Sequence, residues 1–137
     1  DLPPEEAGDL RSLCVKARID TIFFLSPTSA PERVPLVSEA SHGFIYYVSL
    51  TGVTGQRKEL AFDLVQQIRR IKKATDKPIC VGFGISTHEH VVKAQQAADG
   101  VIVGSAIVNM IKQNISRKNK VARVTGFVKE LIYGTGA

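Results

Sequence analysis

The sequence has few cysteines and no long apolar run, and each shortage excludes a class of protein. Its only cysteines are Cys14 and Cys80, too few for the disulfide framework of a small secreted domain. We therefore predict that both are buried thiols in a reducing compartment. No stretch approaches the roughly 18 apolar residues of a membrane-spanning helix, so the sequence predicts no membrane partner.

The first residues lack both the features of a targeting segment and an initiator methionine. The opening DLPPEEAGDL is acidic, whereas signal and transit peptides are basic and poor in acids. The chain starts abruptly at Asp1. We interpret it as a fragment, a processed chain or a trimmed piece of a longer protein.

The basic residues lack interleaved aromatic side chains. The formal net charge of +5 raises the question of nucleic-acid binding. Residues 69–73 (RRIKK), however, end an amphipathic helix, where cations complement the helix dipole. Residues 112–123 (KQNISRKNKVAR) contain no aromatic residue. We interpret both stretches as solvated surface and predict no nucleic-acid partner.

Apolar and charged residues occur in the proportions of an ordinary soluble globular domain. They make up 44% and 23% of the 137 residues, which is enough for one domain with a core. No break in composition divides the chain. We therefore predict a single domain over residues 1–137.

Short apolar segments alternate with helical patterns along the whole chain. This alternation predicts an α/β fold with a parallel sheet. Segments that are apolar at every position predict a sheet buried on both faces. We expect strands at residues 21–25, 43–50, 79–83 and 101–104, and helices at residues 3–18, 30–40, 59–74, 86–98, 105–114 and 121–134.

Two neighbouring strand ends carry glycines and run directly into helices. VGFGIS contains Gly82 and Gly84, and IVGSAI contains Gly104 followed by Ser105. A glycine lets a ligand approach the backbone closely, and a helix N-terminus presents unpaired N–H groups and partial positive charge. The combination is typical of a phosphate site, as after the last two strands of (β/α)8 barrels. The alternative is that these glycines only form tight turns.

The two histidines of STHEH raise a metal hypothesis that their spacing disfavours. His88 and His90 are two residues apart, and such residues do not share a helix face. Ser86 and Glu89 instead fit a capping box, with Ser86 as the N-cap and Glu89 three residues later. We therefore predict no metal site.

The expected strand ends contain no acidic residue. They offer Tyr46, Ser49, Thr51 and Thr54, whereas general acid–base chemistry needs a carboxylate or histidine within reach of the substrate. The residues alone thus predict a phosphate-binding site without an evident acid–base pair.

Six motifs carry a resemblance to a known family. DLPPEE, SPTSAPER, GFIYYVSLTGVTG, ATDKP, VGFGIS and ADGVIVGSAIV resemble, in order and spacing, the tryptophan synthase alpha chain. The resemblance covers nearly the whole chain and weakens after Asn114. It implies the TIM (β/α)8-barrel family, with this chain covering about the last four strands and their helices, the C-terminal half of the barrel.

The resemblance also implies a reaction and a partner. The family's alpha chain is a lyase of tryptophan biosynthesis that cleaves indole-3-glycerol phosphate to indole and glyceraldehyde 3-phosphate. It uses no cofactor of its own, and its beta-chain partner carries pyridoxal phosphate. The expected location is the cytoplasm, or the plastid stroma in a plant.

By the same resemblance, four residues would bind the substrate phosphate. These are Gly55, Gly84, Gly104 and Ser105. The substrate implied for the site is therefore a small phosphorylated molecule.

Three further residues have roles implied by the resemblance. Phe24 would line the indole pocket, and Tyr46 and Thr54 would be catalytic, with Thr54 on a mobile loop. The family's catalytic glutamate and aspartate come from strands that precede this segment. The resemblance therefore implies that the chain needs the N-terminal half of the barrel and is inactive in isolation.

Two other interpretations remain open at this point. The chain could be an inactive or engineered half-barrel that binds phosphate at most, or part of another phosphosugar-binding barrel enzyme. The GVTG sequence beside YVSL disfavours the second of these.

Overall fold

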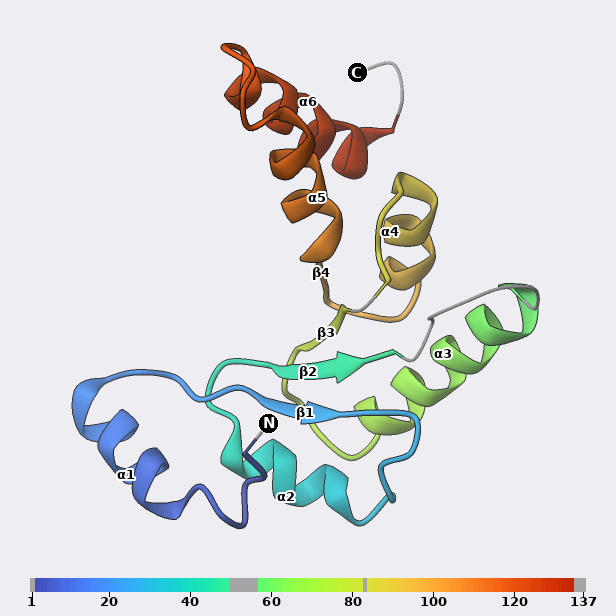
Figure 1. Cartoon of the computed structure of the whole chain (residues 1–137). Helices are drawn as coiled ribbons and strands as arrows, with labels where there is room; N and C mark the ends of the chain where they lie inside the picture. Colours follow the sequence, from blue (N-terminus) through green and yellow to red (C-terminus); the bar gives the residue numbers. More distant parts are fainter. Residues whose placement is uncertain (1, 50–56, 83, 135–137) are drawn as a thin grey trace.

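A computed structural model describes residues 2–49, 57–82 and 84–134 of the chain (Figure 1), with residues 57–63 described by their helical backbone alone. Strands and helices alternate over most of its length. The strands are β1 (Phe23–Leu25), β2 (Ile45–Val48), β3 (Ile79–Gly82) and β4 (Gly100–Ile102), and the helices are α1 (Gly8–Ala17), α2 (Arg33–Ala40), α3 (Arg57–Lys72), α4 (His88–Gln95), α5 (Ser105–Asn114) and α6 (Lys120–Tyr133).

The four strands form one parallel sheet in the order β1-β2-β3-β4. Each strand pairs with the next along the chain, and each connection contains a helix, as βαβ units require. In register across the sheet, Phe24 lies beside Tyr46, Tyr46 beside Cys80, and Cys80 beside Gly100. The predicted α/β fold with a parallel sheet is confirmed.

The two faces of this sheet differ in burial. Alternate residues point to opposite faces, and the set that includes Ile45, Ile79 and Val81 is fully buried with α2, α3 and α4 residues in one core. On the other face Phe24 is 42% exposed, and Tyr46 is half-buried. The prediction of a sheet buried on both faces is therefore wrong for the described residues, since helices cover one face only.

The first helix is shorter and more exposed than its sequence pattern predicts. The chain makes a turn through Pro4, in which the Ala7 amide donates to the Pro4 carbonyl, and α1 begins only at Gly8. No residue of α1 is buried. Cys14 is half-buried on this helix and Cys80 half-buried in β3, so the prediction that both are buried thiols is wrong.

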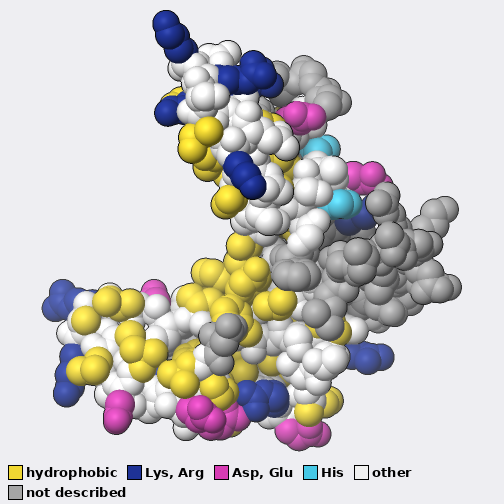
Figure 2. Space-filling model, in the orientation of Figure 1, with side chains coloured by type: hydrophobic (Ala, Val, Ile, Leu, Met, Phe, Trp, Pro, Cys, Tyr) yellow, Lys and Arg dark blue, Asp and Glu magenta, His cyan; other side chains and the backbone are white. Residues whose placement is uncertain are grey.

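Exposed apolar side chains concentrate at the two ends of the sheet. Figure 2 shows hydrophobic side chains over α1 and around the strands. Among the described residues of α2, α3 and α4, only Leu36 and Val92 are large apolar residues of this exposed kind. The exposed set in or beside α1 and β1 is Leu10, Leu13, Val15, Ile19 and Phe24, and that in or beside α5 and α6 is Val108, Ile111, Ile115, Val121, Ile132 and Tyr133.

The C-terminal helices form a unit beyond β4 (Figure 1). Helices α5 and α6 pack against each other, and α6 also packs against α4. The His88 ring donates from Nδ1 to the Leu131 carbonyl at 3.0 Å, which ties α4 to the end of α6. None of the described helices is long and apolar enough to cross a membrane.

Candidate phosphate site at the carboxyl ends of the strands

The carboxyl ends of β3 and β4 lie on one edge of the sheet, and a helix follows each strand. Gly82 lies in register with Ile102 on the adjacent parallel strand. Gly84 and Gly104 each follow two residues later, so both glycines leave the sheet at the same level and on the same edge. The sequence prediction that these glycines share one edge is confirmed.

The start of α5 is open toward this edge. Gly104 is the N-cap residue, and its carbonyl accepts from the Ile107 and Val108 amides at 3.0 and 3.1 Å. In the described part of the chain no side chain caps this helix, and its first turn has no acidic residue. The first amides of a helix have no carbonyl partner within it, so those of α5 form an uncapped, partially positive end with the exposed Ser105 beside it.

Gly84 and Gly104 differ in whether the backbone requires a glycine. Gly84 has a φ of +76°, a left-handed conformation that other residues adopt at a cost. Gly104 has a φ of −109°, and a Cβ added there would meet no atom within 4 Å. The tight-turn alternative therefore explains Gly84, whereas neither the φ angle nor packing requires glycine at 104. Among the described residues, none fills the space beside Gly104.

Gly82 has a packing role that the sequence interpretation missed. A Cβ at this position would lie 2.3 Å from Tyr46 Oη and 2.4 Å from Tyr46 Cε2. The ring of Tyr46 therefore lies directly over the Gly82 backbone. Gly82 admits a neighbouring side chain rather than a ligand, which corrects its assignment to the phosphate site.

Tyr46 and Phe24 form an aromatic pair on the open face of the sheet. Their ring centroids are 5.2 Å apart and their planes meet at 67°, an edge-to-face geometry that aromatic rings favour. The adjacent Tyr47 points the other way, where its hydroxyl donates to Gln67 and burial raises the pKa of Tyr47 to about 12. Of the two tyrosines in β2, Tyr46 is thus the one on the open face.

The histidines of STHEH have structural partners, and the capping prediction is wrong by one residue. Helix α4 begins at His88, and its N-cap is Thr87, whose Oγ1 accepts from the His90 amide at 3.3 Å. Glu89 pairs with Lys93 at 2.6 Å one turn later. Since Thr87 is extended and Ser86 lies one residue before it, Ser86 is outside the capping position. The described residues contain no group of side chains that could hold a metal ion.

Two described acidic side chains, Glu5 near the chain's start and Glu89 near this edge, have basic partners, and Glu89 in the first turn of α4 pairs with Lys93. Glu5 and Glu6 are exposed in the turn before α1, and a direct hydrogen bond from Arg33, at 2.6 Å, lowers the pKa of Glu5. Thr54 and Gly55, expected as a catalytic and a phosphate-binding residue, lie outside the described residues.

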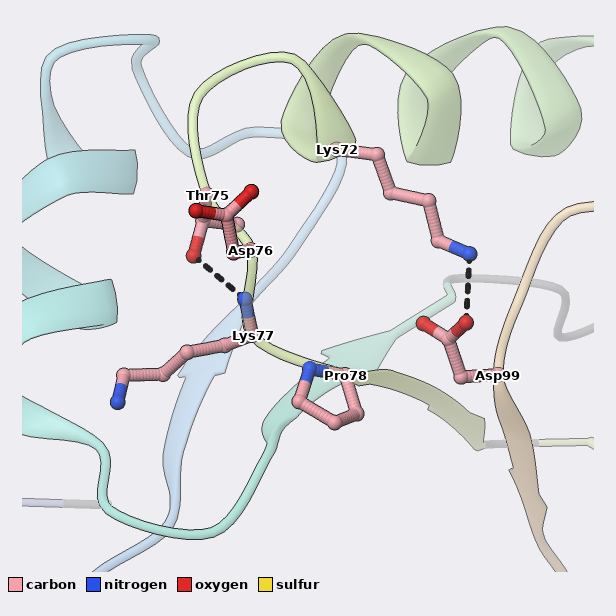
Figure 3. A pocket seen from close by; sticks show the side chains of 6 residues that line it. All are labelled: Lys72, Thr75, Asp76, Lys77, Pro78 and Asp99. Carbon is pink, nitrogen blue, oxygen red and sulfur yellow. Dashed lines mark hydrogen bonds and ion pairs between the residues drawn. The ribbon is translucent and has the colours of Figure 1, made fainter.

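A hollow of about 320 Å³ lies at the amino ends of β3 and β4, at the opposite end of the strands from the candidate phosphate site. Figure 3 shows Lys72 and Asp99 pointing toward one another across it, with Lys77 extending away. Lys72 Nζ lies 2.7 Å from Asp99 Oδ1, and Asp99 Oδ2 accepts from the Ile79 amide at 2.8 Å. The charged groups of Lys72 and Asp99 are thus paired with each other and with the backbone, and we interpret these contacts as structural links between α3, β3 and the start of β4.

Parallel βα units with glycine-ended strands and helix N-termini on one edge define a segment of a (β/α)8 barrel. Comparison with known proteins names the family. A family model described as tryptophan synthase alpha chain matches residues 1–133. Tryptophan synthase alpha chains of Chloroflexus aggregans and of a Geobacter species are 41% and 45% identical, and each match covers 98% of this chain and 50% of the relative. The chain belongs to the tryptophan synthase alpha chain family.

Solved structures agree with this assignment. The tryptophan synthase subunit alpha of Campylobacter jejuni has a TM-score of 0.80 at 32% identity, over 93% of this chain and 49% of that one. A structure of the tryptophan synthase a2b2 complex from Pyrococcus furiosus has a TM-score of 0.80 at 35% identity, over 96% of this chain and 52% of that one. The chain thus spans about half the length of the curated relatives it matches, consistent with the C-terminal half of their TIM barrel.

Proposed function

We propose that this chain supplies the phosphate site of a lyase that cleaves indole-3-glycerol phosphate to indole and glyceraldehyde 3-phosphate. The family match over residues 1–133 is the observation that carries this proposal. The uncapped N-terminus of α5 beside Gly104 supports it, because an anion there would meet free amides and the positive end of the helix dipole.

The phosphate of the substrate would lie at the start of α5, on the edge of the sheet where Gly84 follows β3. In this proposal Gly84, Gly104 and Ser105 bind it, together with Gly55 of the preceding loop. Ser105 adds a hydroxyl donor to the amides of the first turn, and the exposure of all three described residues supports their access to a ligand.

The indole end of the substrate would lie against the open face of the sheet. Phe24 and Tyr46 supply an apolar, aromatic surface there, which suits a flat heteroaromatic ring. Tyr46 is the first residue proposed to act in catalysis, through its hydroxyl. Thr54 is the second residue proposed to act in catalysis, from the loop that follows β2.

We further propose that residues 1–137 are one half of a single barrel domain. Exposed apolar side chains at α1 and at α5–α6 support this, because both ends of the sheet carry surface that a flanking strand and helix would bury. The described carboxyl ends of the strands carry no carboxylate. The catalytic glutamate and aspartate would come from the other half, and the 137 residues alone would be inactive.

A beta chain is the proposed protein partner. The Pyrococcus furiosus relative is described in an a2b2 complex, and the same assembly is proposed here. Pyridoxal phosphate would belong to that partner, and the alpha-type site would work without a cofactor. The cytoplasm, or the plastid stroma in a plant, is the proposed location.

Indole release from indole-3-glycerol phosphate tests the proposal. The 137-residue chain should give no indole, and a polypeptide that joins it to the N-terminal half of a family barrel should give indole, faster with a beta chain present. Turnover by the 137 residues alone would refute the assignment of the carboxylates to the other half. Phosphate binding without turnover in the joined polypeptide would favour the alternative of an inactive phosphate-binding barrel.

A further inference from the structure

Ser49 is a buried hydroxyl at the carboxyl end of β2, and the aromatic pair and helix N-terminus described above do not involve it. It is only 3% exposed. Its Oγ donates to the Gly82 carbonyl at 2.9 Å, and its amide donates to the same oxygen at 3.1 Å. Ser49, the residue directly after β2, thus occupies both acceptor positions of the last carbonyl of β3.

These two hydrogen bonds to the Gly82 carbonyl lie next to the proposed phosphate site. Gly82 is covered on its Cα by the Tyr46 ring, and the left-handed Gly84 follows two residues later. Because the peptide unit is planar, holding the Gly82 carbonyl fixes the direction in which the chain leaves β3 toward Gly84. Ser49 therefore acts at the base of the turn rather than on a ligand.

A second buried serine provides a matched comparison. Ser41 is fully buried, and its Oγ accepts from the Phe23 amide at 3.2 Å. It is the C-cap residue of α2 and bonds to the first residue of β1, at the opposite end of the strands from the glycine turns. Each hydroxyl bonds to the backbone of a strand, but only that of Ser49 does so at the edge where the glycines leave the sheet.

We propose that Ser49 is a positioning residue that, through the Gly82 carbonyl, holds the Gly84 turn in the geometry that receives the substrate phosphate. This inference rests on the proposed function, because it presupposes a phosphate at that edge. Ser49 would then contribute to phosphate affinity indirectly. Without its two hydrogen bonds the Gly84 turn could shift, and its backbone would lose alignment with the anion.

The test compares Ser49→Ala with Ser41→Ala in the intact protein. Both substitutions should lower the melting temperature by a few degrees, roughly 2–8 °C, because each removes a buried hydrogen bond. Only Ser49→Ala should raise the Kd for inorganic phosphate, by about fivefold to tenfold. It should raise KM for indole-3-glycerol phosphate by a similar factor with kcat little changed, the signature of lost ground-state binding.

Two further variants separate positioning from general damage. Ser49→Thr keeps the hydroxyl and should restore phosphate affinity, whereas Ser49→Cys keeps the size but weakens the donor and should fall between serine and alanine. The cysteine variant also serves if Ser49→Ala does not fold.

The outcomes distinguish this inference from the function on which it rests. If the unaltered protein binds phosphate and the Ser49 variants bind it as tightly as Ser41→Ala does, the positioning role is overturned and the phosphate site stands. If the unaltered protein binds no phosphate and releases no indole, the inference and the proposed function both fail.

Discussion

On the face of the sheet that meets the helices, strand residues such as Ile45 and Ile79 are fully buried, whereas on the opposite face Phe24 is 42% exposed. Both faces are built from the same short strands, because alternate residues of each strand point to opposite faces. One face supplies the packing that stabilises the chain. The other presents the aromatic pair of Phe24 and Tyr46, against which a ligand or further protein can lie. Residues of the candidate site and of the core are thus neighbours along each strand.

Substitution on the helix-covered face should have the largest effect. Ile79 is 0% exposed in β3, so Ile79→Ala should lower the free energy of unfolding by about 2–5 kcal/mol, through lost burial and the cavity left behind. Urea unfolding followed by circular dichroism measures it. The control is Leu13→Ala on α1, where the side chain is 63% exposed and the change should stay within about 0.5 kcal/mol. Equal losses in the two variants would remove the contrast.

Substitution of Gly82 tests the close contact on the open face. In Gly82→Ala the new Cβ would lie within 2.3–2.7 Å of three Tyr46 atoms, and moving the ring should cost about 1–3 kcal/mol of folding free energy. Gly104→Ala is the matched control, because a Cβ there meets nothing within 4 Å. Combining Gly82→Ala with Tyr46→Ala should cost less than the sum of the single changes. Additive costs would mean that the ring does not press on Gly82.

The sequence predicts the order of elements well because apolar runs and helical periodicity are local signals. The helix expected at 105–114 matches α5. Three of the four expected strands contain an observed one, and the fourth, expected at 101–104, overlaps β4 (Gly100–Ile102). The strand ends are less well predicted. Gly43 and Phe44 lie before β2, for example, because pairing with a neighbouring strand, which no local pattern records, decides where a strand begins.

The site is predicted in part. That Gly84 and Gly104 share an edge follows from parallel strands, and the structure agrees. The contact between Tyr46 and Gly82 depends on cross-strand register, which a single sequence does not reveal. The alternation of strand residues between the two faces does place Tyr46 and Tyr47 on opposite faces, and the sequence alone shows this. The cap at Thr87 was missed because Ser86 with Glu89 satisfies the same pattern one residue earlier.

Substitution of Gly104 should affect binding and leave folding intact. In Gly104→Asp a carboxylate would stand at the uncapped N-terminus of α5 and compete with an anionic ligand for its amides. We expect the Kd for inorganic phosphate to rise about tenfold, as measured by isothermal titration. Gly104→Asn is a control of the same size without the charge and should have a smaller effect. Unchanged phosphate affinity in a folded Gly104→Asp variant would move the site elsewhere.

Substitution of Asp99 should have the smallest effect and concerns the other end of the strands. Lys72 and then the Ile79 amide lower the pKa of Asp99 through hydrogen bonds. A carboxyl whose pKa is depressed in the folded state adds stability above its usual pKa of about 3.9, and that stability is lost as the pH falls through the folded-state value.

Asp99→Asn should therefore cost up to about 1 kcal/mol of folding free energy at pH 7, a small cost because the pair is partly in water. Near pH 2 the variant and the parent should differ less. Urea unfolding at both pH values measures this, and a cost independent of pH would show that the carboxylate charge contributes nothing to this joint.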